Sequence, residues 1–190
     1  VLQPNSIRDI EVIQKIRDYH PDLIVVVAYG KILPKEILGI PKYGVINVHS
    51  SLLPKYRGAA PIHASIIHGE KESGVSIMYV VEELDAGPVL AQASVEILEE
   101  DNCASLHDKL QEMGANLLIE TIRNMEKQQI QAIPQDEVKA TFVKPFRKED
   151  CKICWNQSAR EIFNFVRGMD PFPGAFTIYQ GKQFKIARVE

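Results

Sequence analysis

Three polar residues stand where apolar runs of the chain end, and their types are those needed for acyl transfer. Asn47 and His49 are two residues apart in the run 44–49, so on a strand both side chains point to the same face. Asp85 follows a second β-type run, and Gly87 and Pro88 shape a turn that could return its carboxylate to the same edge. In open α/β sheets that edge, at the carboxyl ends of the strands, is where ligands bind.

This set of residues fits transfer of an acyl group between two nitrogen atoms. The Asn47 amide could donate to the oxyanion of a tetrahedral intermediate. The His49 imidazole could carry a proton from the attacking amine, and the Asp85 carboxylate could orient that imidazole. Each of the three could also be an ordinary hydrogen-bonded residue at a strand end, so the spacing alone leaves both interpretations open.

The loop after His49 identifies a family. It is rich in small residues and is stiffened by two prolines. Together with the residues before it and the Asp85 turn, it gives four motifs in this order: Asn47-Val-His49, Ser51-Leu-Leu-Pro54, Arg57-Gly-Ala-Ala-Pro61 and Leu84-Asp-Ala-Gly87. In order and spacing they resemble the 10-formyltetrahydrofolate-dependent formyltransferases.

The resemblance assigns roles by position. Asn47, His49 and Asp85 would be the catalytic residues. The remaining assignments concern the folate: a loop around the tetrahydrofolate formed by Ser51, Leu52, Leu53 and Pro54, and a pterin pocket lined by Tyr29, Val81 and Leu84. Arg57 would either contact substrate or pin its own loop. The resemblance implies 10-formyltetrahydrofolate as the formyl donor and no metal.

Within the family, residues 25–34 and 155–177 are most similar to members that formylate initiator methionyl-tRNA for translation initiation. That branch implies a C-terminal β-barrel that helps to hold the tRNA. Asp85-Ala-Gly-Pro88 departs from the Asp-Thr-Gly-Asp commoner in bacterial members of the branch. Other acceptors therefore stay open, namely a nucleotide-linked amino sugar or glycinamide ribonucleotide, as do a 10-formyltetrahydrofolate hydrolase and a non-catalytic binding module.

The pattern of apolar residues predicts an α/β fold. Helices are expected at 6–19, with Ser6 as its N-cap, and at 34–38, 60–68 and 104–127. Strands are expected at 22–29, 44–49, 74–81 and 89–97, the first two of them buried on both faces. This alternation predicts a Rossmann-like, open, mostly parallel sheet. We expect a linker over 129–152 and, over 153–190, a helix and a hairpin. The resemblance implies that residues 1–128 form the catalytic domain and that residues 153–190 begin an OB-like β-barrel domain. The resemblance also implies that about 60 residues of earlier βα units precede Val1 in the family.

Charge is unevenly distributed along the chain. Residues 1–138 hold 12 Lys and Arg against 20 Asp and Glu, whereas residues 139–190 hold 10 against 5. The basic C-terminal part could face a polyanion or carry a chance excess of solvated charge. Three cysteines suit a reducing compartment, and Cys151 and Cys154 have no second pair that would complete a zinc site. We expect a cytoplasmic monomer without a membrane span, an organellar location remaining open.

Overall fold

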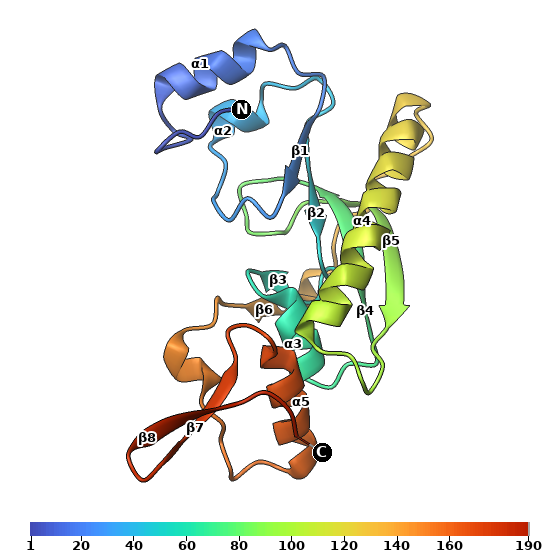
Figure 1. The fold of residues 1–190 in the computed structure, drawn as a ribbon. Coiled ribbons are helices and arrows are strands. Elements are labelled where there is room, and N and C mark those ends of the chain that lie inside the picture. The colour runs from blue at the N-terminus through green and yellow to red at the C-terminus, as the bar shows by residue number, and fades with distance from the viewer. Residues whose placement is uncertain (190) are drawn as a thin grey trace.

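The protein is described here from a computed structural model, which defines residues 1–189. Its N-terminal part contains a four-stranded sheet in the order β1-β2-β4-β5 (Figure 1). The strands are β1 (Ile24–Val27), β2 (Val45–His49), β4 (Glu72–Tyr79) and β5 (Val89–Glu96). β1 and β2 run parallel, while β4 is antiparallel to both β2 and β5, so the sheet in this chain is mixed. The expected α/β class is confirmed.

The helices of this part are α1 (Ile10–Asp18), α2 (Lys35–Leu38), α3 (Pro61–Ile67) and α4 (Cys103–Glu126). Of these, α3 and α4 pack on the sheet and α1 packs on α2. α4 packs across β4 and β5, and its Leu106 and Leu110 join a buried core with Ile46, Ile66 and Ile77. That core fixes β2, the strand that carries Asn47 and His49.

Two expectations about local structure were wrong. The first helix begins at Ile10, with Asp9 rather than Ser6 at its N-cap position. Strand β1 is not buried on both faces, since Val25 is 39% and Val27 60% exposed. β1 lies at one end of the sheet order, where its β-branched residues have a neighbouring strand on one side.

The C-terminal part packs around a second core. Helix α5 (Ala159–Met169) contacts strand β7 (Ala175–Tyr179), which forms the expected hairpin with β8 (Lys182–Ile186). Both turn residues, Gln180 and Gly181, have positive φ, as a two-residue hairpin turn requires. This core consists of Cys151, Ile153, Val166, Met169, Ala175 and Phe176. Helix α5 also packs against α3, which joins the two parts (Figure 1).

The segment expected to be a linker has structure of its own. It contains two 3₁₀ turns, η1 (Glu137–Lys139) and η2 (Lys148–Cys151), and the short strand β6 (Phe142–Val143). β6 pairs in parallel with β3 (Arg57–Gly58), within the loop that follows His49. The chain therefore returns to the predicted site after α4 ends.

Candidate active site

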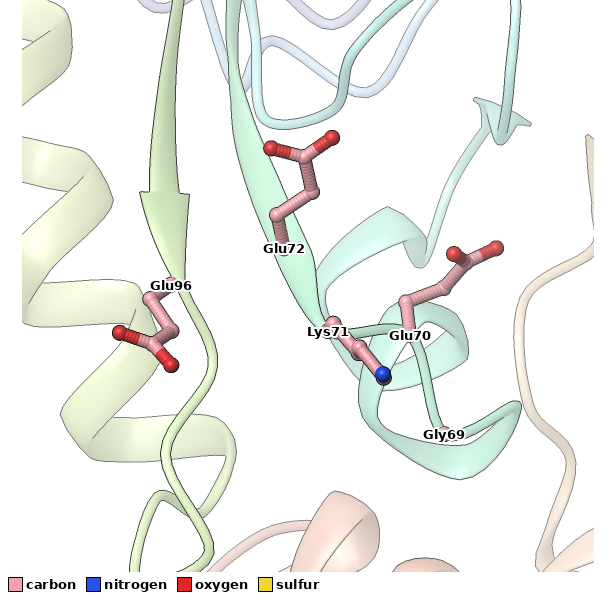
Figure 2. A pocket seen from close by; sticks show the side chains of 5 residues that line it. All are labelled: Gly69, Glu70, Lys71, Glu72 and Glu96. Carbon is pink, nitrogen blue, oxygen red and sulfur yellow. The ribbon is translucent and has the colours of Figure 1, made fainter.

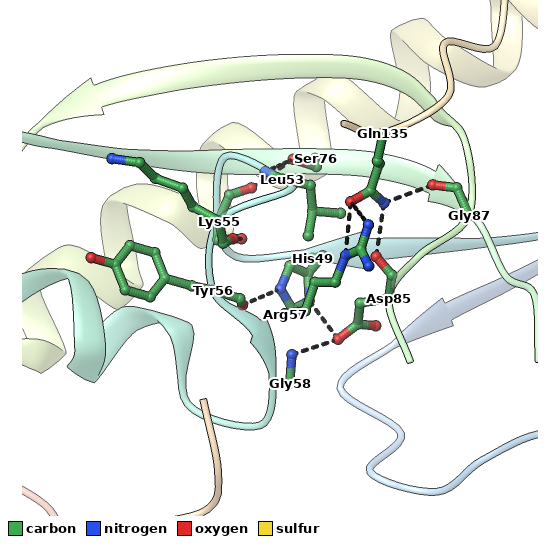
Figure 3. Close-up of polar contacts among 11 residues, drawn as sticks. His49, Leu53, Lys55, Tyr56, Arg57, Gly58, Ser76, Asp85, Gly87 and Gln135 are labelled. Atoms are coloured by element: carbon green, nitrogen blue, oxygen red, sulfur yellow. Dashed lines mark hydrogen bonds and ion pairs between the residues drawn. The ribbon is translucent and has the colours of Figure 1, made fainter. Parts of the chain in front are cut away.

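His49 is held at the end of β2 by a backbone carbonyl. Its side chain is 7% exposed, and its Nε2 lies 2.9 Å from the carbonyl oxygen of Tyr56 (Figure 3). A carbonyl oxygen only accepts, so Nε2 carries the hydrogen and donates it. In the neutral ring, Nδ1 is consequently the unprotonated nitrogen.

The carbonyl that holds His49 belongs to a residue fixed at several points. The Tyr56 N–H donates to the Thr141 hydroxyl at 2.8 Å, and the Tyr56 hydroxyl donates to Glu70 at 2.7 Å. The ring also stacks on His68 with 5.7 Å between centroids. Burial, together with the bond to Glu70, raises the pKa of the Tyr56 phenol above its usual range, so it stays a neutral donor.

Asp85 lies near the other ring nitrogen of His49, Nδ1. Its Oδ2 lies 3.7 Å from His49 Nδ1 and accepts a 2.8 Å hydrogen bond from the Gly58 N–H (Figure 3). Asp85 itself has φ of 49°, a left-handed conformation that Asp tolerates better than most residues. Once His49 takes a proton on Nδ1, the carboxylate is placed to stabilise the imidazolium.

Asn47 lies two residues before His49 on β2, opposite Met78 of β4, and is half-buried. Within residues 1–189 no hydrogen bond engages its side-chain amide, so that amide is free to donate to a ligand. The structure thus brings His49 and Asp85 into contact and places Asn47 next to them along the strand.

Hydrogen bonds from two side chains of the sheet hold the backbone of the loop predicted to surround the folate. Ser76 accepts a hydrogen bond from the Leu53 N–H and donates to the Ser51 carbonyl, while Gln92 donates to the Leu53 carbonyl. Ser51 and Leu53 are buried, and the Ser51 hydroxyl donates to the Lys55 carbonyl at 2.6 Å. These side chains therefore shape the loop, and its half-buried Leu52 and Pro54 are the ones left partly open.

Tyr29 and Leu84 are exposed and Val81 is half-buried, so all three are accessible for a ligand. Beside the 81–84 segment is a hollow lined by apolar and charged residues: Arg8, Ile10, Ile13, Ile32, Leu33, Pro34, Lys35, Glu36 and Glu82. Another hollow, lined by Gly69, Glu70, Lys71, Glu72 and Glu96, contains none of the predicted site residues (Figure 2). Its Glu70 is the residue that accepts the hydrogen bond from the Tyr56 hydroxyl.

Arg57 is 2% exposed, and all three nitrogens of its guanidinium donate hydrogen bonds. It donates to Gln135 Oε1 at 3.0 Å and 2.9 Å and to Glu137 at 2.9 Å and 2.7 Å. The Arg57 bonds lower the pKa of the Glu137 carboxyl. Of the two roles left open for Arg57, these contacts favour pinning the loop over binding substrate.

Gln135 was not predicted from the sequence. Its amide lies between Arg57 and the Asp85 turn, yet it stands in a polar stretch without periodicity, where no local signal distinguishes it. Among the residues that the structure describes, no group of three His, Cys, Asp or Glu could hold a metal ion. Across the same residues no helix is long and apolar enough to cross a membrane.

The sequence and the fold agree with one family. The profile described as Formyl transferase matches residues 1–122, and the profile described as Formyl transferase, C-terminal domain, matches residues 145–190. The chain belongs to the formyl transferase family, as its motifs predicted.

Among its relatives, the methionyl-tRNA formyltransferase of Fusobacterium nucleatum subsp. nucleatum is 59% identical over 98% of this chain and 60% of that protein. The methionyl-tRNA formyltransferase of Halalkalibacterium halodurans is 50% identical over 98% of this chain and 59% of that protein. The chain thus spans about 60% of the length of these curated relatives.

Solved structures share the fold at low identity. A sugar N-formyltransferase from Shewanella sp. superposes with a TM-score of 0.80 at 24% identity, covering 97% of this chain and 75% of that one. HypX from Aquifex aeolicus, in complex with tetrahydrofolic acid, gives a TM-score of 0.77 at 23% identity over 91% of this chain and 30% of that one.

Proposed function

We propose that the full-length protein transfers a formyl group from 10-formyltetrahydrofolate to the amino group of initiator methionyl-tRNA, in translation initiation. The observation that carries the chemistry is the position of His49 between the Tyr56 carbonyl and the Asp85 carboxylate. The acceptor is supported by relatives of 59% and 50% identity that are named methionyl-tRNA formyltransferases.

The mechanism follows from the tautomer of His49. Because Nε2 donates to Tyr56, Nδ1 is the nitrogen that takes a proton from the attacking amine as the new C–N bond forms. Asn47 donates to the formyl oxygen as it becomes an oxyanion. When the C–N10 bond of the donor breaks, Nδ1–H returns its proton towards the leaving nitrogen, and Asp85 stabilises the imidazolium between these two steps.

The remaining assignments belong to the same proposal. Residues 1–128 would form the catalytic domain, with the 51–54 loop, Tyr29, Val81 and Leu84 around the folate. Residues 153–190 would begin the tRNA-binding β-barrel domain, supported by the net positive charge of the chain after residue 138. We place the protein in the bacterial cytoplasm, since the relatives named above are bacterial, and we propose that it is a monomer.

The test is formyl transfer by the full-length protein from 10-formyltetrahydrofolate to three acceptors in parallel: methionyl-tRNA, a nucleotide-linked amino sugar and glycinamide ribonucleotide. We expect product on methionyl-tRNA, and a loss of about 10²- to 10⁴-fold in rate for His49→Ala with folate still bound. His107→Ala is the matched control, because His107 is an exposed histidine on α4. Product on another amine alone would overturn the acceptor, and full activity of His49→Ala would overturn the mechanism.

A further inference from the structure

One segment between the two matched parts of the chain binds both loops of the candidate site. Ile133 forms a bridge with Val89, just after the Asp85 turn. Further along, the Thr141 carbonyl accepts from the Arg57 N–H at 2.8 Å, and the Val143 carbonyl accepts from the Ala59 N–H at 3.0 Å. Residues 133–143, here named the return segment, thus lie against the Asp85 turn at one end and the loop after His49 at the other.

Gln135 of the return segment connects the two loops through a single side chain. Its Nε2 donates to the Asp85 carbonyl at 2.8 Å and to the Gly87 carbonyl at 2.7 Å (Figure 3). Its Oε1 accepts two bonds from Arg57. Both hydrogens and the oxygen of the amide are therefore used, a combination of two donors and one acceptor that Glu and Met of similar size cannot supply.

The Asp85 turn has little room to find another position. A Cβ on Gly87 would stand 1.8 Å from the Tyr79 carbonyl oxygen, so the turn lies directly on the backbone of β4. The Asp85 backbone is in the left-handed region, which surrounding contacts must maintain. The position of this turn sets the distance between Asp85 Oδ2 and His49 Nδ1, which is 3.7 Å.

We propose that Gln135 is a positioning residue for the reaction, acting through Asp85. By holding the Asp85 and Gly87 carbonyls, its amide sets the distance between the carboxylate and His49. The inference rests on the proposed function for its chemistry, while its geometry rests on the contacts of Gln135 alone.

Gln135→Glu separates the two contacts of Gln135, the acceptor for Arg57 and the two donors to the Asp85 turn. A glutamate keeps an acceptor for Arg57 but loses both donors to the turn and places a negative charge beside two carbonyl oxygens. Simple pinning of Arg57 would leave Gln135→Glu active. Positioning of Asp85 predicts that kcat falls about 10- to 100-fold with little change in the KM for folate, since small displacements of catalytic groups have effects of this size. Gln131→Glu, an exposed glutamine before the return segment, is the matched control and should change kcat less than about twofold.

A double-variant cycle tests the route through Asp85. In an Asp85→Asn background, whose residual transfer is followed in single turnovers, adding Gln135→Glu should cost less than about twofold, because residues that act as a unit are not additive. A full additional loss in that background, or parental activity of Gln135→Glu alone, would overturn the proposal. Should Gln135→Glu fail to fold, Gln135→Met, neutral and of similar size, enters the same cycle.

The proposed function and this inference fail in different ways. Activity of the unmutated full-length protein on methionyl-tRNA reports on the function. The ratio of variant to parent is measured on whichever amine accepts the formyl group, or on release of tetrahydrofolate in water when none does. That ratio reports on Gln135 independently of the acceptor.

Discussion

At the scale of single residues, the hydrogen bond of His49 decides which ring nitrogen could act as a base. The Tyr56 carbonyl fixes Nε2 as the donor, so in the proposed mechanism the base is Nδ1 and its partner is Asp85. That mechanism requires the reacting amine to approach from the Asp85 side of the ring. Tyr56 matters through its backbone rather than its side chain, since the side chain serves to keep that carbonyl in place.

This assignment predicts a single tautomer in solution. In ¹⁵N-histidine spectra at a pH where the ring is neutral, we expect His49 to carry its hydrogen on Nε2, because moving it to Nδ1 would leave the Tyr56 carbonyl without a donor. Exposed His20, whose ring makes no hydrogen bond within residues 1–189, serves as the internal reference, with both tautomers populated in exchange. A neutral His49 with its hydrogen on Nδ1 would contradict the mechanism, since Nε2 would then be the base.

The sequence could predict Asn47, His49 and Asp85 as candidates, because strand alternation and turn chemistry are local properties. It could not predict the Tyr56 carbonyl, since every residue has one and only the folded path of the chain selects it. Gln135 could not be predicted either, because only the folded path of the chain brings it to the site. Its partners Asp85 and Arg57 lie 50 and 78 residues away, and the polar stretch around it has no period that would fix its direction.

At the scale of elements, the N-terminus of α4 is a polar junction. Asn102 caps the helix by accepting from the Ser105 N–H, while Asp101, 3% exposed, accepts from the Leu98 N–H, the Ser105 hydroxyl and Lys109. The sequence predicted this helix to within one residue at each end, because its apolar stripe is long. It misplaced the start of α1, where Ser6 imitates a cap, and overstated the burial of β1, where an apolar run does not tell whether another strand lies alongside.

The Asp101 carboxylate predicts a specific acid sensitivity. Burial would raise its pKa, but the Lys109 ammonium, the Leu98 N–H and the Ser105 hydroxyl outweigh burial and lower it. A native pKa below the unfolded value of about 3.9 stabilises the fold above that pH, and this stabilisation is lost as the pH falls from about 4 towards the native pKa.

Urea unfolding between pH 7 and pH 3 checks this prediction. Asp101→Asn should lower the free energy of unfolding at pH 7 by about 1 to 3 kcal/mol and flatten its fall below pH 4. Asp108→Asn, at an exposed position of α4, should do neither. If the free energy of unfolding fell in parallel with pH for Asp101→Asn and the parent, the Asp101 carboxylate would contribute nothing to the loss of stability in acid.

At the scale of the whole molecule, the N-terminal and C-terminal parts are joined at several places. Helix α5 packs on α3, Arg167 of α5 donates to the carbonyls of Leu98 and Asp101, and Asn102 donates to Asp170. The return segment adds a covalent connection that runs through the candidate site. A polyanion bound to the basic C-terminal part would therefore be held in a fixed position relative to the site, because the two parts pack against each other.

Close packing of α5 on α3 depends on Gly168. A Cβ there would stand 2.6 Å from Ile67 Cγ1 and 3.3 Å from the His63 carbonyl, so α5 would have to move away from α3. Alanine favours a helix over glycine by about 1 kcal/mol, while overpacking costs about 1 to 3 kcal/mol, so Gly168→Ala should lower the free energy of unfolding by about 1 kcal/mol net.

Gly114→Ala in α4 is the matched comparison for Gly168→Ala. Its Cβ would meet side-chain methyl groups alone, Val48 Cγ1 at 3.3 Å and the two Val75 methyl groups at 3.5 and 3.6 Å, and it gains the same helix propensity. In urea unfolding of the full-length protein, Gly114→Ala should therefore be more stable than Gly168→Ala by at least about 1 kcal/mol. Limited proteolysis should show faster cleavage near α5 in Gly168→Ala alone, because only there is the junction between the two parts loosened. Equal stability of the two variants would mean that α5 is not seated on α3 through this glycine.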